Sequence, residues 1–197
     1  MDNAMELFEK DERYRNFHLD GQTIVLDDYL EIHPENREKL KKYVQEGRFH
    51  VGPWYILQDE FLTSGEAAVR NLLTGMREAK EFGGLCPVGY FPDAFGNAGQ
   101  MPQLLKQAGM KAVAFGRGVK PVGFNNEAKE GGAYESTYSE MNWESMDGSG
   151  LLGILFANWY NNGAEIPVEP EEAKEYWDQR FKAAKHFAGT SQLLFMN

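Results

Sequence analysis

The sequence is poor in cysteine and has no long apolar run. Its 197 residues include one cysteine, Cys86, which excludes an internal disulfide framework and a zinc site built from several cysteines. No stretch of about 18 consecutive apolar residues is present, as a helical membrane span requires. Residues 1–10 lack the basic and apolar regions of a secretion signal. These absences favour a reducing, cytoplasmic location.

Positive charge is also scarce. The chain has 20 Lys and Arg residues against 30 Asp and Glu residues, which gives a net charge of -10. Because phosphate backbones and anionic membrane surfaces repel such a surface, we expect neither nucleic acid nor membrane as a partner. The composition, 42% hydrophobic and 13% aromatic, is typical of a folded chain rather than a disordered one.

Several common catalytic and binding motifs are missing. The four histidines stand alone, with no pair at the spacing of a helical metal motif: His18, His33, His50 and His186. The sequence contains no Gly-x-Ser-x-Gly nucleophile elbow, no Walker loop and no Gly-x-Gly-x-x-Gly fingerprint. It therefore does not match the usual serine hydrolase, nucleoside triphosphatase or dinucleotide-binding patterns.

What the sequence does contain is an alternation of strand and helix patterns. Strands are predicted at residues 17–20, 48–51, 87–91 and 112–115, and helices at 34–45, 65–82, 100–108 and 170–187. A loop is predicted at 120–134. A hairpin is predicted to pair 138–143 with 151–156 around the turn at 146–150. A last strand is predicted at 191–197. This order predicts an α/β fold with a mostly parallel sheet.

Both ends of the chain are abrupt. Met1, Met5 and Phe8 have helical spacing with no capping residue before them, and the last predicted strand reaches the final residue, Asn197. Domains usually end in polar surface segments. We therefore expect the chain to be a piece of a longer protein.

Polar and aromatic side chains follow the predicted strands. They are Asp20 and Gln22 after the first strand, Trp54, Asp59 and Glu60 after the second, Asp93 and Phe95 after the third, Arg117 after the fourth, and Tyr160 after the hairpin. Ligands of α/β folds sit at the carboxyl ends of strands. Aromatic faces together with carboxylates, amides and an arginine suit a sugar, whose ring has apolar C–H faces and polar hydroxyl edges.

Each of these residues also has a purely structural interpretation. Trp54 and Tyr160 fit core or rim aromatics, Asp20 fits a turn, Asp59–Glu60 fits the start of a helix, and Arg117 fits a surface ion pair. Asp93 is the hardest to explain structurally, because a carboxylate directly after a buried strand must be solvated, paired or bound to a metal.

One segment resembles a known catalytic motif. Residues 89–105, GYFPDAFGNAGQMPQLL, resemble the nucleophile motif of the glycoside hydrolase family 38 α-mannosidases. Gly52-Pro53-Trp54 followed by Asp59-Glu60 resembles an upstream family motif, Asp20-Gly21-Gln22 resembles another, and Arg117 falls where the family carries a sugar-site arginine. The bacterial branch, which includes mannosylglycerate hydrolase-like enzymes, is the most similar.

The resemblance implies a fold and a domain. It implies a partial seven-stranded β/α barrel, with residues 1–197 forming a single incomplete N-terminal catalytic domain, truncated at both ends. The exposed sheet edges of an incomplete barrel would favour self-association into a homo-oligomer.

The resemblance also implies a mechanism. The family consists of retaining, metal-dependent α-mannosidases that usually carry zinc. Asp93 would be the nucleophile and one metal ligand, while Phe95, Arg117, Trp54, Asp59 and Tyr160 would bind the mannoside. The other metal ligands and the general acid have no counterpart here and would lie outside the chain, so we expect the isolated chain to be inactive. Asp59 and Glu60 are alternatives for the second carboxyl group that a retaining glycosidase needs, although the resemblance does not place the acid there.

The sequence departs from the family pattern at two positions. Asn97 stands where many members have histidine, and Ala94 stands where many have proline or serine. Two other functions remain open at this point: a polysaccharide deacetylase-like barrel and a non-catalytic carbohydrate-binding module. The first would need an aspartate followed by a His-x3-His pair, which the sequence lacks.

Overall fold

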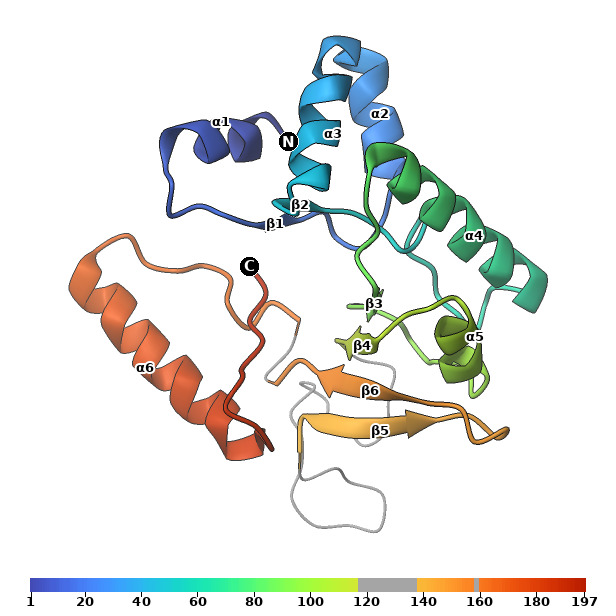
Figure 1. The fold of residues 1–197 in the computed structure, drawn as a ribbon. Helices are drawn as coiled ribbons and strands as arrows, with labels where there is room; N and C mark the ends of the chain where they lie inside the picture. Colours follow the sequence, from blue (N-terminus) through green and yellow to red (C-terminus); the bar gives the residue numbers. More distant parts are fainter. Residues whose placement is uncertain (117–137, 158–159) are drawn as a thin grey trace. The chain divides into compact units, whose positions relative to one another are not determined.

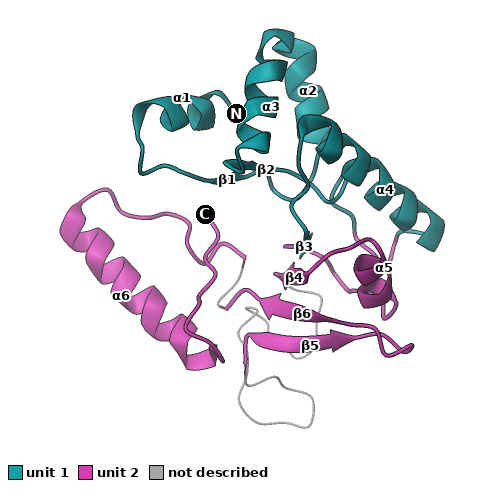
Figure 2. Cartoon of the chain, viewed as in Figure 1, with its two compact units in different colours: residues 1–58, 63–90 teal, residues 59–62, 91–197 magenta. Residues whose placement is uncertain are grey.

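The computed structural model describes residues 1–116, 138–157 and 160–197 (Figure 1). These residues divide into two compact units (Figure 2). Unit 1 comprises residues 1–58 and 63–90, and unit 2 comprises residues 59–62 and 91–197. The loop predicted at 120–134 lies outside the described residues.

Unit 1 is mostly helical, with one small parallel sheet. Its elements are α1 (Asp2–Lys10), β1 (Phe17–His18), α2 (Ile24–Ile32), the 3-10 turn η1 (Pro34–Asn36), α3 (Arg37–Gln45), β2 (Phe49–His50), α4 (Gly65–Phe82) and most of β3 (Val88–Phe91). Strands β1 and β2 pair in parallel. The strands predicted at 17–20 and 48–51 are shorter than expected because the backbone turns away at positive φ, at Asp20 (42°) and at Gly52 (73°).

The long helix α4 has both its predicted bounds. Ser64 caps its N-terminus by accepting a hydrogen bond from the Ala67 N–H at 3.2 Å, and Gly83 ends it in a left-handed conformation with φ 112°. Gly75 lets the helix approach the chain closely, since a Cβ there would lie 2.1 Å from the Trp54 carbonyl carbon. Helix α4 is therefore fitted against the segment that carries Trp54.

Helix α2 was not predicted. Its first residues, Ile24 and Val25, are β-branched, and Leu26 is its one fully buried residue. The helical periodicity of apolar residues is therefore weak. The predicted helix at 34–45 exists as η1 followed by α3, because Pro34 begins a 3-10 turn before the α-helix.

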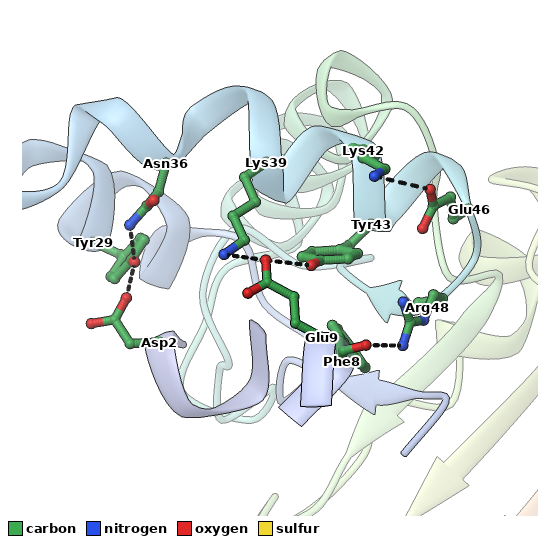
Figure 3. Close-up of polar contacts among 10 residues, drawn as sticks. All are labelled: Asp2, Phe8, Glu9, Tyr29, Asn36, Lys39, Lys42, Tyr43, Glu46 and Arg48. Carbon is green, nitrogen blue, oxygen red and sulfur yellow. Dashed lines mark hydrogen bonds and ion pairs between the residues drawn. The ribbon is translucent and has the colours of Figure 1, made fainter. Parts of the chain in front are cut away.

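The core of unit 1 is aromatic and aliphatic. Its fully buried members include Leu26, Leu40, Phe49, Val51 and Ala79. Arg48 ties the amino-terminal segment to this core: its guanidinium donates to the carbonyl oxygens of Phe8 at 3.0 Å and Tyr14 at 3.2 Å. The same group lies 4.4 Å from the centroid of the Phe8 ring and 5.5 Å from that of Tyr43 (Figure 3).

Unit 2 holds a mixed sheet and two helices. Within unit 2 its strands lie in the order β4-β6-β5, with β4 at Ala112–Phe115, β5 at Glu140–Glu144 and β6 at Gly150–Leu155. Strand β4 runs parallel to β6, and β5 pairs antiparallel with β6, which confirms the predicted hairpin. The helices are α5 (Met101–Gln107) and α6 (Pro170–Phe187). An α/β fold is thus confirmed, whereas the described residues show two open sheets and no closed barrel.

The strand predicted at 191–197 is wrong. That segment forms no strand, because its backbone groups bond to the buried side chain of Asn162 rather than to a neighbouring strand. The Asn162 amide donates to the Leu194 carbonyl oxygen at 2.9 Å and accepts from the Met196 N–H at 2.8 Å. Hydrophobicity alone could not reveal this side-chain anchor.

Replacing Arg48 with alanine should destabilise unit 1. Two hydrogen bonds to carbonyl oxygens and the contacts with two rings would be lost, at a cost of about 2 kcal/mol in the free energy of unfolding. The control is Lys42→Ala, which removes an exposed ion pair with Glu46 at 3.8 Å and should cost less than about 0.5 kcal/mol. Urea denaturation measures both, and equal effects would show that Arg48 contributes no more than a surface residue.

Candidate functional site

The loop that carries Asp93 joins β3 to α5 within unit 2. Along it, side chains alternate between the inside and the outside: Asp93 is exposed, Ala94 is buried and Phe95 is 69% exposed. The carboxyl group of Asp93 and the ring of Phe95 therefore both reach solvent, while the backbone between them is held by a buried alanine. We call residues 92–99 the Asp93 loop.

The start of the Asp93 loop is fixed by Gly116. The Gly116 N–H donates to the Phe91 carbonyl oxygen at 2.8 Å. A Cβ at Gly116 would lie 1.6 Å from the Pro92 carbonyl oxygen and 2.9 Å from Cβ of Tyr160. Only glycine permits this approach, which brings the segments carrying Asp93 and Tyr160 together at the end of β4.

The end of the Asp93 loop is fixed by residues 59–62, which we call the Asp59–Leu62 segment. Oε2 of Glu60 accepts a hydrogen bond from the Ala98 N–H at 2.6 Å, and Glu60 is 5% exposed. The ring of the next residue covers Gly96, where a Cβ would lie 1.8 Å from Cδ2 of Phe61. These four residues belong to unit 2, although the residues on both sides of them belong to unit 1.

The Glu60 carboxyl group has an unusual environment. The pKa of Glu60 is raised from 4.5 to about 7, chiefly by burial and also by the negative charge of Asp59, against the opposing effect of the Ala98 N–H. Oε1 of Glu60 is buried and has no hydrogen-bond partner among the described residues. The group therefore ionises near neutral pH instead of well below it.

A second cluster lies in unit 1, after β1. Asp20 has φ 42°, which is uncommon for a residue other than glycine, and accepts hydrogen bonds from Gln22 at 3.0 Å and from the Tyr90 hydroxyl. Burial raises the pKa of Asp20 despite these bonds. Burial, with a smaller effect of His50, lowers the pKa of His18 to about 4, so His18 is neutral at physiological pH.

Trp54 also belongs to this second cluster, as a core residue. Its side chain is 1% exposed, and its indole N–H donates to the Tyr90 carbonyl oxygen at 3.0 Å. A fully buried indole offers no open face for stacking against a sugar ring. The burial of Trp54 therefore does not support the prediction that this residue contacts a substrate.

The predicted site residues thus divide into three groups. Asp59, Asp93, Phe95 and Tyr160 belong to unit 2, Trp54 belongs to unit 1, and Arg117 lies outside the described residues. The contacts by which Glu60 and Phe61 hold the Asp93 loop were not predicted from the sequence. The sequence does place two carboxylates directly before two apolar residues, Phe61 and Leu62, which is an unusual pattern. It does not show that the partner of Glu60 is Ala98, 38 residues further along the chain.

The donor groups do not by themselves complete a metal site. Within the described ranges, no group of three or more His, Cys, Asp or Glu side chains is arranged to hold a metal ion. Asp93 can offer a carboxylate oxygen, whereas zinc usually takes at least three protein ligands. None of the helices in the described part of the chain is long and apolar enough to cross a membrane.

The family model described as the glycosyl hydrolases family 38 N-terminal domain matches residues 1–196. The chain belongs to glycoside hydrolase family 38. A family relative from Halalkalibacterium halodurans, named "Putative mannosylglycerate hydrolase", is 56% identical over 198 residues, which cover 100% of this chain and 22% of that protein. Family 38 membership does not support the polysaccharide deacetylase-like alternative.

Solved structures from family 38 agree with this assignment. The structure of an alpha-mannosidase from Enterococcus faecalis V583 matches with a TM-score of 0.88 at 49% identity. The match covers 100% of this chain and 21% of the alpha-mannosidase chain. The structure of a family 38 protein from Enterococcus faecalis matches with a TM-score of 0.79 at 43% identity. This match covers 100% of this chain and 20% of the other. The chain therefore spans about a fifth of the length of these relatives.

Replacing Gly116 with alanine should disrupt the start of the Asp93 loop. The new Cβ would meet the Pro92 backbone, which cannot move aside as a flexible side chain could, and the cost should be about 3 kcal/mol in the free energy of unfolding. Gly99→Ala is the control, because no atom lies within 4 Å of its Cβ position, and it should change stability by less than about 0.5 kcal/mol. Thermal denaturation tests both; an unchanged melting temperature for Gly116→Ala would contradict the close approach.

Replacing Glu60 with glutamine should change how stability depends on pH. A carboxyl group whose pKa is raised in the folded state loses stability as pH rises from its usual 4.5 to about 7, since the unfolded chain then releases its proton more readily. The wild-type protein should therefore lose roughly 3 kcal/mol relative to Glu60→Gln across that interval, and no more above it.

The measurement is thermal or urea denaturation of both proteins between pH 4.5 and 8. Glu66→Gln, which alters an exposed carboxyl group paired with Arg70, should follow the wild-type curve. A constant difference between wild type and Glu60→Gln over the whole interval would mean that Glu60 titrates as an ordinary surface carboxyl group.

Proposed function

We propose that the protein that carries this chain is a retaining α-mannosidase, and that Asp93 is its nucleophile. The observation that carries the proposal is the Asp93 loop itself. Its sequence resembles the family's nucleophile motif, its carboxyl side chain is exposed, and its backbone is fixed at Pro92 and at Ala98. A nucleophile needs this combination of an accessible reactive atom and an immobile backbone.

The proposed reaction proceeds in two displacements. An oxygen of the Asp93 carboxylate attacks the anomeric carbon, the bond to the leaving oxygen breaks, and a covalent mannosyl-enzyme forms. Water then attacks the same carbon from the side of the departed group, gives its proton to the now deprotonated general acid, and breaks the bond to Asp93, which releases mannose and the free carboxylate. Two successive inversions retain the anomeric configuration. The general acid that protonates the leaving oxygen is proposed to lie outside these 197 residues.

We propose that Phe95 and Tyr160 form walls of the mannose subsite. The exposed ring of Phe95 can stack on a C–H face of the sugar, and Tyr160 lies beside the start of the loop, at Gly116. Arg117 and Asp59 are proposed to bind sugar hydroxyl groups. Trp54, because it is buried against Tyr90, is proposed to support the site from within the core.

The remaining features of the domain are also proposals. Residues 1–197 would be one incomplete N-terminal catalytic domain that contributes part of a seven-stranded β/α barrel. A divalent metal, zinc by analogy with the family, would be held by Asp93 together with ligands outside this chain and would polarise sugar hydroxyl groups. We further propose a cytoplasmic, homo-oligomeric protein. The chain alone would be inactive.

The substrate class proposed is an α-mannoside. The name of the relative from Halalkalibacterium halodurans supports mannosylglycerate as the first natural substrate to test. The glycosidic linkages of mannose-containing oligosaccharides are the next set.

Asp93→Asn in the full-length protein should remove turnover of 4-nitrophenyl α-mannoside. An amide cannot attack the anomeric carbon as a carboxylate does, and the loss should be at least about 10³-fold in kcat. Asp147→Asn, at an exposed turn that binds Ser149, is the control and should keep full activity. Normal turnover by Asp93→Asn would overturn the assignment of the nucleophile.

A further inference from the structure

We propose that Glu60 is a positioning residue that holds the Asp93 loop in place through its bond to the Ala98 N–H. The inference rests on the proposed function, because it concerns the loop that carries the proposed nucleophile. It assigns Glu60 no contact with the sugar.

The first support is the placement of the Asp59–Leu62 segment. The chain leaves unit 1 after Gln58, contributes four residues to unit 2, and returns to unit 1 at Thr63. Within unit 2 these residues contact the Asp93 loop at two points, Ala98 and Gly96. The segment therefore packs with the loop rather than with its own neighbours in sequence.

The second support is the geometry of the bond. Its length is 2.6 Å from Ala98 N to Oε2 of Glu60, which is at the short end for a hydrogen bond from an N–H group. The carboxyl group is 5% exposed, so water competes little for the bond. Burying a carboxyl group costs free energy unless it forms hydrogen bonds. The bond to Ala98 is therefore a poor candidate for an incidental contact.

The third support is the distribution of anchors along the loop. Pro92 is fixed against Gly116, Ala94 is buried, Gly96 lies under the Phe61 ring, and Ala98 is bonded to Glu60. Asp93 lies between the first two anchors. Ala98 is the last anchor before α5, and its carbonyl oxygen accepts from the Met101 N–H at 2.9 Å. Loss of the Glu60 bond would therefore loosen the loop at its carboxyl end, while Pro92, Ala94 and Gly96 stay held.

A general acid is the alternative role for Glu60. Its raised pKa near 7 would suit an acid. However, Oε1 is buried, and Oε2 is occupied by the Ala98 N–H. An acid must reach the leaving oxygen of the substrate, and the burial of both oxygens favours the positioning role instead.

Two conservative variants of the full-length protein separate these roles. Glu60→Gln keeps a carbonyl oxygen at the same reach and so keeps the bond to Ala98, but it cannot donate a proton as an acid. Glu60→Asp keeps the acid but withdraws it by one methylene group, so the bond is lost. Positioning predicts that glutamine is the better replacement, whereas acid catalysis predicts that aspartate is.

The readout is the rate at which Asp93 becomes covalently labelled by 5-fluoro-α-mannosyl fluoride, measured by mass spectrometry. In this step the Asp93 oxygen bonds to the anomeric carbon as the carbon–fluorine bond breaks, and fluoride leaves with the electron pair without needing a proton. The step therefore reports the placement of the nucleophile and not the general acid. Steady-state kcat and KM for 4-nitrophenyl α-mannoside are measured alongside.

Glu60→Gln should label within about fivefold of the wild-type rate, and Glu60→Asp should label about 10²-fold more slowly, the loss expected for a misplacement near 1 Å. KM should change less than kcat. Slow labelling by Glu60→Gln, or wild-type labelling by Glu60→Asp, would overturn the positioning role. Melting temperatures are recorded for each variant, and Glu60→Leu, which also lacks the bond to Ala98 and should label equally slowly, replaces Glu60→Asp if that variant does not fold.

The controls separate this inference from the proposed function. Glu66→Gln, an exposed glutamate on α4, should label at the wild-type rate. Asp93→Asn should not label at all. If the label in the wild-type protein is found on a residue other than Asp93, the proposed nucleophile fails. If the label is on Asp93 but Glu60→Asp, which lacks the bond to Ala98, labels at the wild-type rate, only the positioning role fails.

Discussion

The contact of Gly116 with Pro92 is the constraint on which the site in unit 2 depends. The residue after β4 lies so close to the residue after β3 that a Cβ at Gly116 would be 1.6 Å from the Pro92 carbonyl oxygen. No side chain fits between them. The loop after β3 is therefore fixed at Pro92, directly before the exposed side chain of Asp93.

Glu60 represents a different kind of constraint. An apolar residue at this position would avoid the desolvation of a carboxyl group, so the stability of the fold alone does not account for it. Functional sites commonly retain such unfavourable groups, and the surrounding structure compensates for them. In unit 2 the compensation comes from the buried Ala94 and from the Phe61 ring packed over Gly96.

Local patterns in the sequence were sufficient for helix α4, strand β4 and helix α6, whose bounds were all predicted. Each is marked by local signals, such as Ser64 and Gly83 around α4 and Pro170 at the start of α6. Two of the failures depend on contacts between residues distant in sequence: the anchoring of residues 191–197 by Asn162 and the bond from Glu60 to Ala98. Strand β1 is instead shortened by the positive φ of Asp20. Asp93 was predicted as a site residue because its motif is local.

The boundary between the two units is crossed by the chain three times, after residues 58, 62 and 90. No single cut can therefore yield either unit as an uninterrupted polypeptide. During synthesis, residues 59–62 emerge before Gly96 and Ala98 exist, so Glu60 and Phe61 lack their partners in the Asp93 loop until residue 98 has been made. A nascent chain stalled before residue 98 would leave this segment without the contacts that place it in unit 2.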